Sequence, residues 1–292
     1  MSQPLRPKRR DLLSPGDIIK DLHDLPSAPA VLPRLLRILN DYTASMEDVM
    51  TLIKLEPGVA ARVLQMGNIA YYSSRGGRCS SLDDAVSRIG SLKIYEIVAF
   101  AVSAQLLMRK LGCYEMEAED LWRRSVVCAI SASLLAADCD IDPNTAYTIG
   151  LFHSVGMVAI DSWLKREEMT QTVESKGLPD ETIEDEKRVI GFTNATTAAA
   201  LLKSWSFQSS VCEAVRWQYS PLSAGVNRRP ACLLHVAKWL QAASLNTVPA
   251  KFPAMPSEEI RKVIGMGEYD FEALYVAVRE EFERVSLVLV AS

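Results

Sequence analysis

The sequence predicts an all-α fold, and three observations support that prediction. Apolar residues recur at helical spacing along most of the chain, for example at Leu32, Leu35, Leu36 and Leu39, which would share one face of a helix. A sustained alternation of apolar and polar residues, the signature of a half-buried strand, is hard to find. Polar residues that typically begin or end helices separate the apolar runs. The chain is therefore expected to consist of many short helices.

The first helices are defined by residues at their N-termini. Pro33 interrupts the first apolar pattern, and it either opens that helix or kinks one that begins near Pro29; the fixed φ of proline is compatible with both. Downstream, Ser45 and Asp48 resemble a capping box, in which two side chains satisfy backbone groups at a helix start. Ser81 and Asp84 have the same spacing. Helices are expected to begin at both places.

Later helices carry the same signals. Residues 94–101 repeat the helical spacing of apolar side chains, and Asp142 followed by Pro143 is a favourable pair for a helix N-terminus. Residues 271–282 carry the pattern again near the end of the sequence. The apolar run at 285–290 could mimic a strand, but it ends a helical pattern, so we expect a helix there too.

Three regions are expected along the chain. Residues 1–10 contain four basic residues and two prolines and are expected to be a disordered basic tail; a basic arm that touches nucleic acid or an acidic lipid is the alternative. The rest divides near Gly112 into an N-terminal helical lobe, 11–112, and a larger helical lobe, 113–292. No long flexible linker separates the two lobes, so they are expected to pack together.

Composition narrows the class of protein. About half of the 292 residues are hydrophobic and the net charge is −4. A sizeable core is therefore possible, and nucleic-acid binding, which usually needs a basic face, is not expected. No stretch reaches the ~18 apolar residues of a membrane-spanning helix, and no signal peptide is evident. The six cysteines form no Cys-x-x-Cys pair. A cytoplasmic protein with reduced thiols and no membrane association is expected.

Several short segments carry more specific information. In chain order they are LPSAPAV at 25–31, IKLEPGVAARVL at 53–64, GNIAYY at 67–72, SLDDAVSRIG at 81–90 and GLFHSVG at 150–156. Each segment is weakly specific alone, but in this order they resemble the HDOD family, the HD-related output domains of bacterial signalling proteins. The resemblance extends from about residue 25 to about residue 238, which is most of the chain.

The resemblance implies an HD-related helical bundle preceded by a smaller N-terminal helical lobe. It also implies a role in signal transduction, for example downstream of a two-component receiver or in a cyclic-dinucleotide pathway. In the catalytic relatives, the metal-dependent phosphohydrolases of the HD superfamily, several helices contribute metal ligands. One of those helices carries the adjacent His and Asp that name the superfamily.

Most of the matching positions have lost their ligands. At the name-giving pair His153 is retained, but Ser154 replaces the Asp, and a neutral hydroxyl is a poor ligand for a hard cation. Arg124 stands where a His often follows Trp-Arg, and Asn194 stands where another His is usual. Lys238 stands where a late helix often has Asp.

A paired-His segment is also replaced, by Gln218 and Tyr219. The matched positions together define a candidate vestigial pocket: Arg124, His153, Ser154, Asn194, Gln218, Tyr219 and Lys238. A divalent metal needs about three His, Cys or carboxylate ligands at one point, and the two cationic side chains would repel it. We therefore expect no catalytic residue, no bound metal and no cofactor. A divergent metal-dependent phosphohydrolase with unusual ligands is the alternative.

Two interpretations remain open for the pocket. His153 is either a buried histidine hydrogen-bonded to a neighbour or part of a ligand site. Arg124 and Lys238 either close the former cavity or form a cationic site for a small phosphate-bearing, nucleotide-like ligand, since arginine binds phosphate well. The expected function is a non-catalytic signalling module that binds a protein partner or such a ligand.

A second candidate surface lies at the end of a helix in the first lobe. Asn68, Tyr71 and Tyr72 precede the turn at residues 75–77. They are either structural, since Asn can cap a helix end and tyrosines bridge core and surface, or they form an exposed patch for a signalling partner.

Overall fold

The computed structural model describes residues 14–21, 31–41, 43–55, 57–68, 81–169, 172–173, 179–245, 254–266 and 271–290. Within these ranges every regular element is an α-helix or a 3-10 helix, apart from one isolated bridge between Leu111 and Met116. The predicted all-α fold is confirmed.

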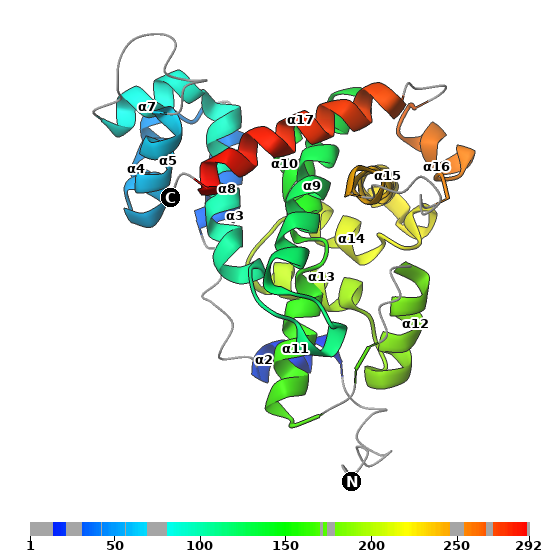
Figure 1. The fold of residues 1–292 in the computed structure, drawn as a ribbon. Helices are drawn as coiled ribbons and strands as arrows, with labels where there is room; N and C mark the ends of the chain where they lie inside the picture. Colours follow the sequence, from blue (N-terminus) through cyan, green and yellow to red (C-terminus); the bar gives the residue numbers. More distant parts are fainter. Residues whose placement is uncertain are drawn as a thin grey trace.

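The first lobe is a cluster of short helices. They are α3 (Val31–Leu39), α4 (Met46–Lys54), α5 (Pro57–Gly67), α7 (Leu82–Ile89) and the longer α8 (Ser91–Leu107). α3 buries Leu32, Leu35 and Leu36 because their spacing puts them on one face. Pro33 lies in the first turn of α3, where a missing N–H costs little. In Figure 1, α4, α5 and α7 stand together beside the larger bundle, and α8 lies between them and it.

The capping residues behave as their chemistry suggests. Ser45 and Asp48 form a complete capping box at the start of α4. At the start of α7, the Ser81 hydroxyl accepts a hydrogen bond from the Asp84 N–H. The Asp84 carboxylate pairs with Arg88 one turn further along. The Asp84 carboxylate is therefore paired with a neighbouring arginine, and only the serine half of the predicted capping box is seen at the start of α7.

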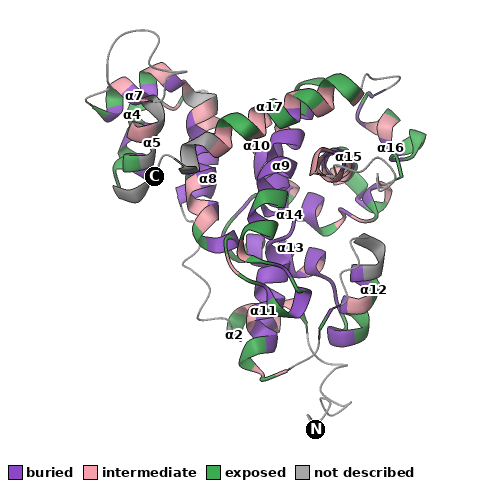
Figure 2. Cartoon of the chain, in the orientation of Figure 1, coloured by how far each residue is buried: buried purple, intermediate pink, exposed green. Residues whose placement is uncertain are grey.

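The larger bundle contains the remaining helices. They are α2 (Pro15–Asp21), α9 (Ala118–Ala136), α10 (Pro143–Phe152), α11 (Val155–Arg166), α12 (Pro179–Ile190), α13 (Asn194–Ser204), α14 (Ser209–Arg216), α15 (Arg228–Leu245), α16 (Glu258–Val263) and α17 (Phe271–Val290). Asp142 caps α10, which begins at Pro143, as expected. α9 packs against α10 and α15 and is largely buried in Figure 2.

α2 packs with a different lobe from the one predicted from the sequence. The predicted division put residues 11–112 in the first lobe, but α2 packs against α11 and α13 of the larger bundle. Ile18 is fully buried in α2. Burial of one apolar side chain is enough to favour this contact by about 2 kcal/mol.

The C-terminal helix α17 lies across the bundle and reaches towards α8 (Figure 1). It packs against α9 and α15, and Trp239 of α15 meets Phe271 of α17 edge-on, with ring centroids 5.1 Å apart. The helix continues through residues 285–290, as the sequence predicted.

Among the helices that the structure describes, no single one is long and apolar enough to cross a membrane. The pair Leu82–Ile89 and Lys93–Leu107 meets the length and composition criteria only when joined, and it is bent by 114°.

Candidate functional site

The His153 motif lies at the turn between α10 and α11. α10 ends just before His153, and α11 begins just after Ser154. Gly156 allows this turn to press against the N-terminus of α13, because a β-carbon at Gly156 would lie 2.0 Å from the Asn194 carbonyl oxygen. The contact between α11 and α13 therefore requires glycine at this position.

The His153 side chain is buried and hydrogen-bonded. Its Nδ1 lies 2.7 Å from the Gly150 carbonyl oxygen, and because a carbonyl only accepts, Nδ1 carries the proton. Burial lowers the pKa of His153 to about 3, helped by the positive charges of Lys238 and Arg124. The imidazole is therefore neutral at physiological pH. Of the two interpretations, the structure favours the buried histidine bonded to a neighbour.

Gln218 connects the His153 turn to α15. It is fully buried just after α14. Its Nε2 donates to the His153 carbonyl oxygen at 2.9 Å and to the Val215 carbonyl oxygen at 3.0 Å. Its Oε1 accepts from the Lys238 ammonium at 2.7 Å. The Gln218 amide therefore links the His153 turn and α14, through its nitrogen, to α15, through its oxygen.

The Lys238 ammonium has a second partner, the ring of Tyr219. Nζ lies 3.7 Å from the ring centroid, a close cation–π contact. The Tyr219 hydroxyl in turn lies 3.3 Å from the Asn194 side-chain nitrogen and 3.4 Å from its oxygen. Three residues from the predicted pocket are thus joined in one chain of contacts across α13 and α15.

A buried carboxylate, Glu186 of α12, completes the cluster. Its oxygens accept hydrogen bonds from the Asn194 N–H at 2.6 Å, from the Asn194 side-chain amide at 3.0 Å and from the Tyr114 hydroxyl at 2.7 Å. Burial raises the pKa of Glu186 to about 7, although these bonds and the charge of Lys238 favour the ionised form. We call the cluster the polar centre: His153, Glu186, Asn194, Gln218, Tyr219 and Lys238.

Sequence reasoning missed Glu186 for a physical reason. It belongs to the strongly charged segment 180–188, which is typical of a solvated helix face. A signal was present, however, because Ile183 and Val189 lie three residues before and after it and are also buried. Helical spacing therefore places this acid on the inner face of α12.

The other two predicted pocket residues are less engaged. Ser154 is buried at the start of α11, and its side chain makes no cap hydrogen bond there. Arg124 is exposed on α9. It lies close enough to His153 to lower the pKa of that imidazole, but it is the last of the contributing causes. The structure thus brings together five of the seven predicted residues and leaves Arg124 at the surface.

The candidate partner patch in the first lobe is described in part. The Asn68 side chain donates to the Leu64 carbonyl oxygen at 2.9 Å, which supports the structural interpretation of this residue as a helix-end group. Tyr71 and Tyr72 lie outside the described residues, so the patch itself stays a prediction.

The residues of the polar centre do not fit a divalent metal. Imidazole, amide, phenol and ammonium groups surround a single carboxylate, and the ammonium adds a positive charge among them. No group of three or more His, Cys, Asp or Glu side chains suited to a metal occurs within the described part of the chain. The donor set lacks the charge and the ligand number that such an ion needs.

Comparisons with known proteins agree with this fold. A family model of the HDOD domain matches residues 25–221. No match was found among curated proteins. An HDOD domain protein with unknown function from Geobacter sulfurreducens is 20% identical, with a TM-score of 0.64 over 94% of this chain and 96% of that one.

Two further solved structures are similar. A candidate phosphohydrolase from Shewanella amazonensis SB2B is 24% identical, with a TM-score of 0.62 over 90% of this chain and 93% of that one. A candidate signal transduction protein from Marinobacter aquaeolei VT8 is 22% identical, with a TM-score of 0.69 over 94% of this chain. The chain spans 60% of the length of that second protein. At these identities the likeness shows a shared fold.

Proposed function

The chain belongs to the HDOD domain family, and from that premise we propose that it is a non-catalytic signal-transduction module that acts by binding a protein partner. One observation carries the proposal. The Lys238 ammonium lies among the residues that match metal-ligand positions of HD phosphohydrolases, held at 2.7 Å from Gln218 Oε1 and 3.7 Å from the Tyr219 ring centroid. A cation held among these positions disfavours the binding of a metal ion there.

Electrostatics supports this interpretation. A dication about 6 Å from the Lys238 ammonium would be repelled by about 5 kcal/mol at an effective dielectric constant of 20. A single carboxylate, Glu186, could offset part of that repulsion, but its oxygens already accept hydrogen bonds from Asn194 and Tyr114. Binding a metal here would break several buried hydrogen bonds, each of which is costly to leave unmade.

A protein partner is favoured over a phosphate-bearing, nucleotide-like ligand. The phosphate hypothesis requires Lys238 and Arg124 to face a common ligand. Lys238 instead points its ammonium at Gln218 and Tyr219, and Arg124 is exposed on α9. Nucleotide binding that is lost in Arg124→Ala would revive that hypothesis.

A divergent phosphohydrolase is the second candidate function. The phosphohydrolase name of the structural neighbour from Shewanella amazonensis favours it. This function would require metal-dependent turnover at a site that includes His153, the one retained member of the His-Asp pair.

The test is hydrolysis of bis(p-nitrophenyl) phosphate with added Mg²⁺, Mn²⁺, Fe²⁺ or Zn²⁺. We expect the wild-type protein and Ser154→Asp to show the same background as His153→Ala, because restoring one acid does not supply the other ligands. Metal-dependent turnover in wild type or Ser154→Asp that disappears in the corresponding His153→Ala protein would overturn the proposal and establish the enzyme.

A further inference from the structure

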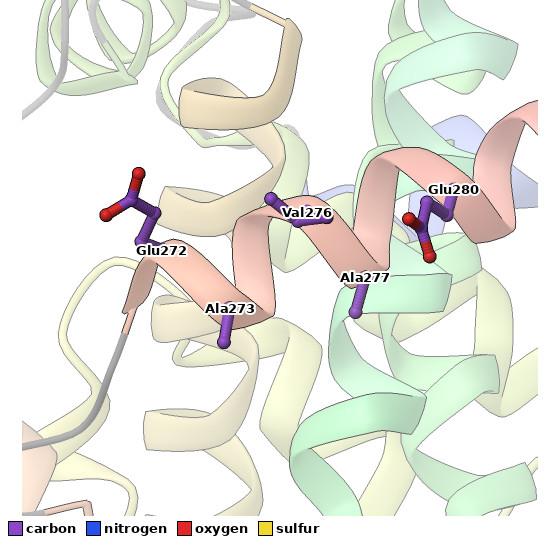
Figure 3. A pocket seen from close by; sticks show the side chains of 5 residues that line it. All are labelled: Glu272, Ala273, Val276, Ala277 and Glu280. Atoms are coloured by element: carbon purple, nitrogen blue, oxygen red, sulfur yellow. The ribbon is translucent and has the colours of Figure 1, made fainter.

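The C-terminal helix α17 packs on the bundle through one side and leaves the other side open. Among residues 271–286, for which burial is described, one side chain is buried, that of Val278. Phe271, Leu274 and Phe282 share its side of the helix and pack on the core while remaining half-buried. The open face on the opposite side, shown in Figure 3, is lined by Glu272, Ala273, Val276, Ala277 and Glu280. The helix therefore buries far fewer side chains than α9 or α10.

One attachment of α17 is a cluster of charged side chains that crosses between the two lobes. The Lys93 ammonium of α8 lies 2.6 Å from a Glu96 oxygen and 2.8 Å from a Glu281 oxygen of α17. Glu96 also accepts a hydrogen bond from the Ser133 hydroxyl of α9 at 3.3 Å, and Arg284 pairs with Glu281. Burial alone would lower the pKa of Lys93, but the two carboxylates outweigh it and raise that pKa. The ammonium is therefore held in its charged form between α8 and α17.

This cluster lies at the joint between the first lobe and the larger bundle. α8 packs against α9, α10 and α11 of the bundle and against α3, α5 and α7 of its own lobe. α17 packs against α9 and α15, and it meets α8 through the ion pair of Lys93 and Glu281. Near the other end of α17, the Phe271 ring meets that of Trp239 on α15. α17 thus extends from α15 to the joint, a path that can be followed in Figure 1.

We propose that α17 is a releasable strap, which opens as one unit separately from the bundle and which the ion pair of Lys93 and Glu281 holds closed across the joint. Local opening is favoured where few apolar side chains are buried and many groups face solvent, and α17 meets both conditions. When the strap opens, α8 loses its charged contact with α17, so the first lobe is held less tightly to the bundle. This inference goes beyond the proposed function and does not depend on it.

A permanent structural helix is the alternative. Such a helix would open only when the whole bundle unfolds, so its backbone amides would exchange with solvent as slowly as those of the core. α9 supplies the reference for the core, because its residues 126–130 are all buried. The two possibilities therefore differ in the rate at which α17 exchanges relative to α9.

The test is hydrogen exchange of the full chain, followed by mass spectrometry of its peptides. We expect the amides of α17 to exchange at least about tenfold faster than those of α9. Glu281→Gln keeps the shape of the side chain but weakens its pairing with Lys93. It should speed the exchange of α17 by about fivefold and that of α8 by about twofold or more, while α9 keeps the wild-type rate. The α9 peptides thus show in each variant that the bundle is intact.

The matched control is Glu258→Gln, which makes the same change in an exposed ion pair with Lys262 on α16 and should leave the exchange of α17 unchanged. Phe271→Ala tests whether the strap opens as one unit. It removes the ring contact with Trp239, which lies about 15 Å along the helix from Glu281, and should still speed exchange around Glu281.

Four results would overturn the inference. They are α17 amides that exchange as slowly as those of α9, equal effects of Glu281→Gln and Glu258→Gln, an unchanged rate for α8 in Glu281→Gln, and faster exchange in Phe271→Ala that is confined to the first turn of α17. None of these affects the proposed function, which fails separately if the protein shows the metal-dependent hydrolysis described above.

Discussion

The polar centre and the face of α17 that carries Val276 and Glu280 both contain charged side chains, but they differ in how far those side chains are buried. In the polar centre the Lys238 ammonium donates to Gln218 and the Glu186 carboxylate accepts from Asn194 and Tyr114, so both charged groups are satisfied by neighbours within the chain. On α17, Glu280 is exposed and bounds an open surface. Burial forces polar groups to be paired internally. The hydrogen bonds of the polar centre therefore support the fold, whereas the Glu280 carboxylate faces solvent.

The largest effect is expected where the polar centre is packed most closely. Gly156→Ala would place a β-carbon 2.0 Å from the Asn194 carbonyl oxygen and 2.7 Å from the Ala198 nitrogen. Both are backbone atoms, so α11 and α13 must separate, and we expect a loss of about 3 kcal/mol or more in the free energy of unfolding. Urea denaturation measures this loss.

The control for this substitution is Gly112→Ala. Its β-carbon would meet the end of the Lys165 side chain at 3.6 Å, which is an ordinary contact. A Gly156→Ala protein as stable as Gly112→Ala would show that the tight contact between the two helices is wrong.

Removing the tethered cation should have the next largest effect. Lys238→Met keeps the length of the side chain but leaves the buried Gln218 Oε1 without its ammonium donor and removes a charge that favours the ionised form of Glu186. We expect a loss of about 2 kcal/mol in the free energy of unfolding.

The matched variant is Lys262→Met. That lysine pairs with Glu258 at 2.6 Å, but both side chains are exposed, so a change of about 0.5 kcal/mol or less is expected. Equal losses from the two substitutions would mean that Lys238 has no special role in the polar centre.

Glu186 should give the polar centre a distinctive pH dependence. Its pKa is about 7 in the folded protein against a normal value of 4.5, so between those values the folded state binds a proton that the unfolded state does not. The free energy of unfolding should therefore decrease as pH rises from about 4.5 to about 7, by up to about 3 kcal/mol from this group.

Glu186→Gln isolates that contribution. His153 acts in the opposite sense, because its lowered pKa makes the folded protein more stable as pH rises from about 3 to 6.5. The difference between wild type and Glu186→Gln cancels the histidine term. We expect that difference to favour the variant increasingly as pH rises, and parallel stability curves from pH 5 to 8 would contradict it.

The smallest effect on stability is expected on α17. Glu280→Ala removes an exposed carboxylate and should change the free energy of unfolding by about 0.5 kcal/mol or less. A much larger loss in the free energy of unfolding, measured by the same urea denaturation, would mean that this face of α17 supports the fold, as the polar centre does.

The fold could be predicted because its signals are local. The apolar spacing at Leu32, Leu35 and Leu36 and the caps at Ser45 and Asp142 each involve residues a few positions apart. Helical periodicity and capping chemistry are properties of such short segments. They define where helices begin and which face they bury, and the structure confirms them.

The site could be predicted only in part, because its contacts join distant residues. Gln218 and Lys238 were identified from the resemblance, but their bond, and the contact of Lys238 with the Tyr219 ring, depend on how α14 and α15 pack. Glu186 was hidden in a charged segment, and its partner Tyr114 is 72 positions away. The placement of α2 on α11 and α13 likewise follows from tertiary packing.

The most direct test of the central claim is the metal content of the full chain, measured by elemental mass spectrometry on protein purified without a chelator or an affinity metal. Because the polar centre holds the Lys238 ammonium and a single hydrogen-bonded carboxylate, the protein should contain iron, manganese, zinc and nickel only at substoichiometric levels while remaining folded and monodisperse. One equivalent or more of any of these metals, lost in His153→Ala, would contradict the account and favour a metal-dependent enzyme.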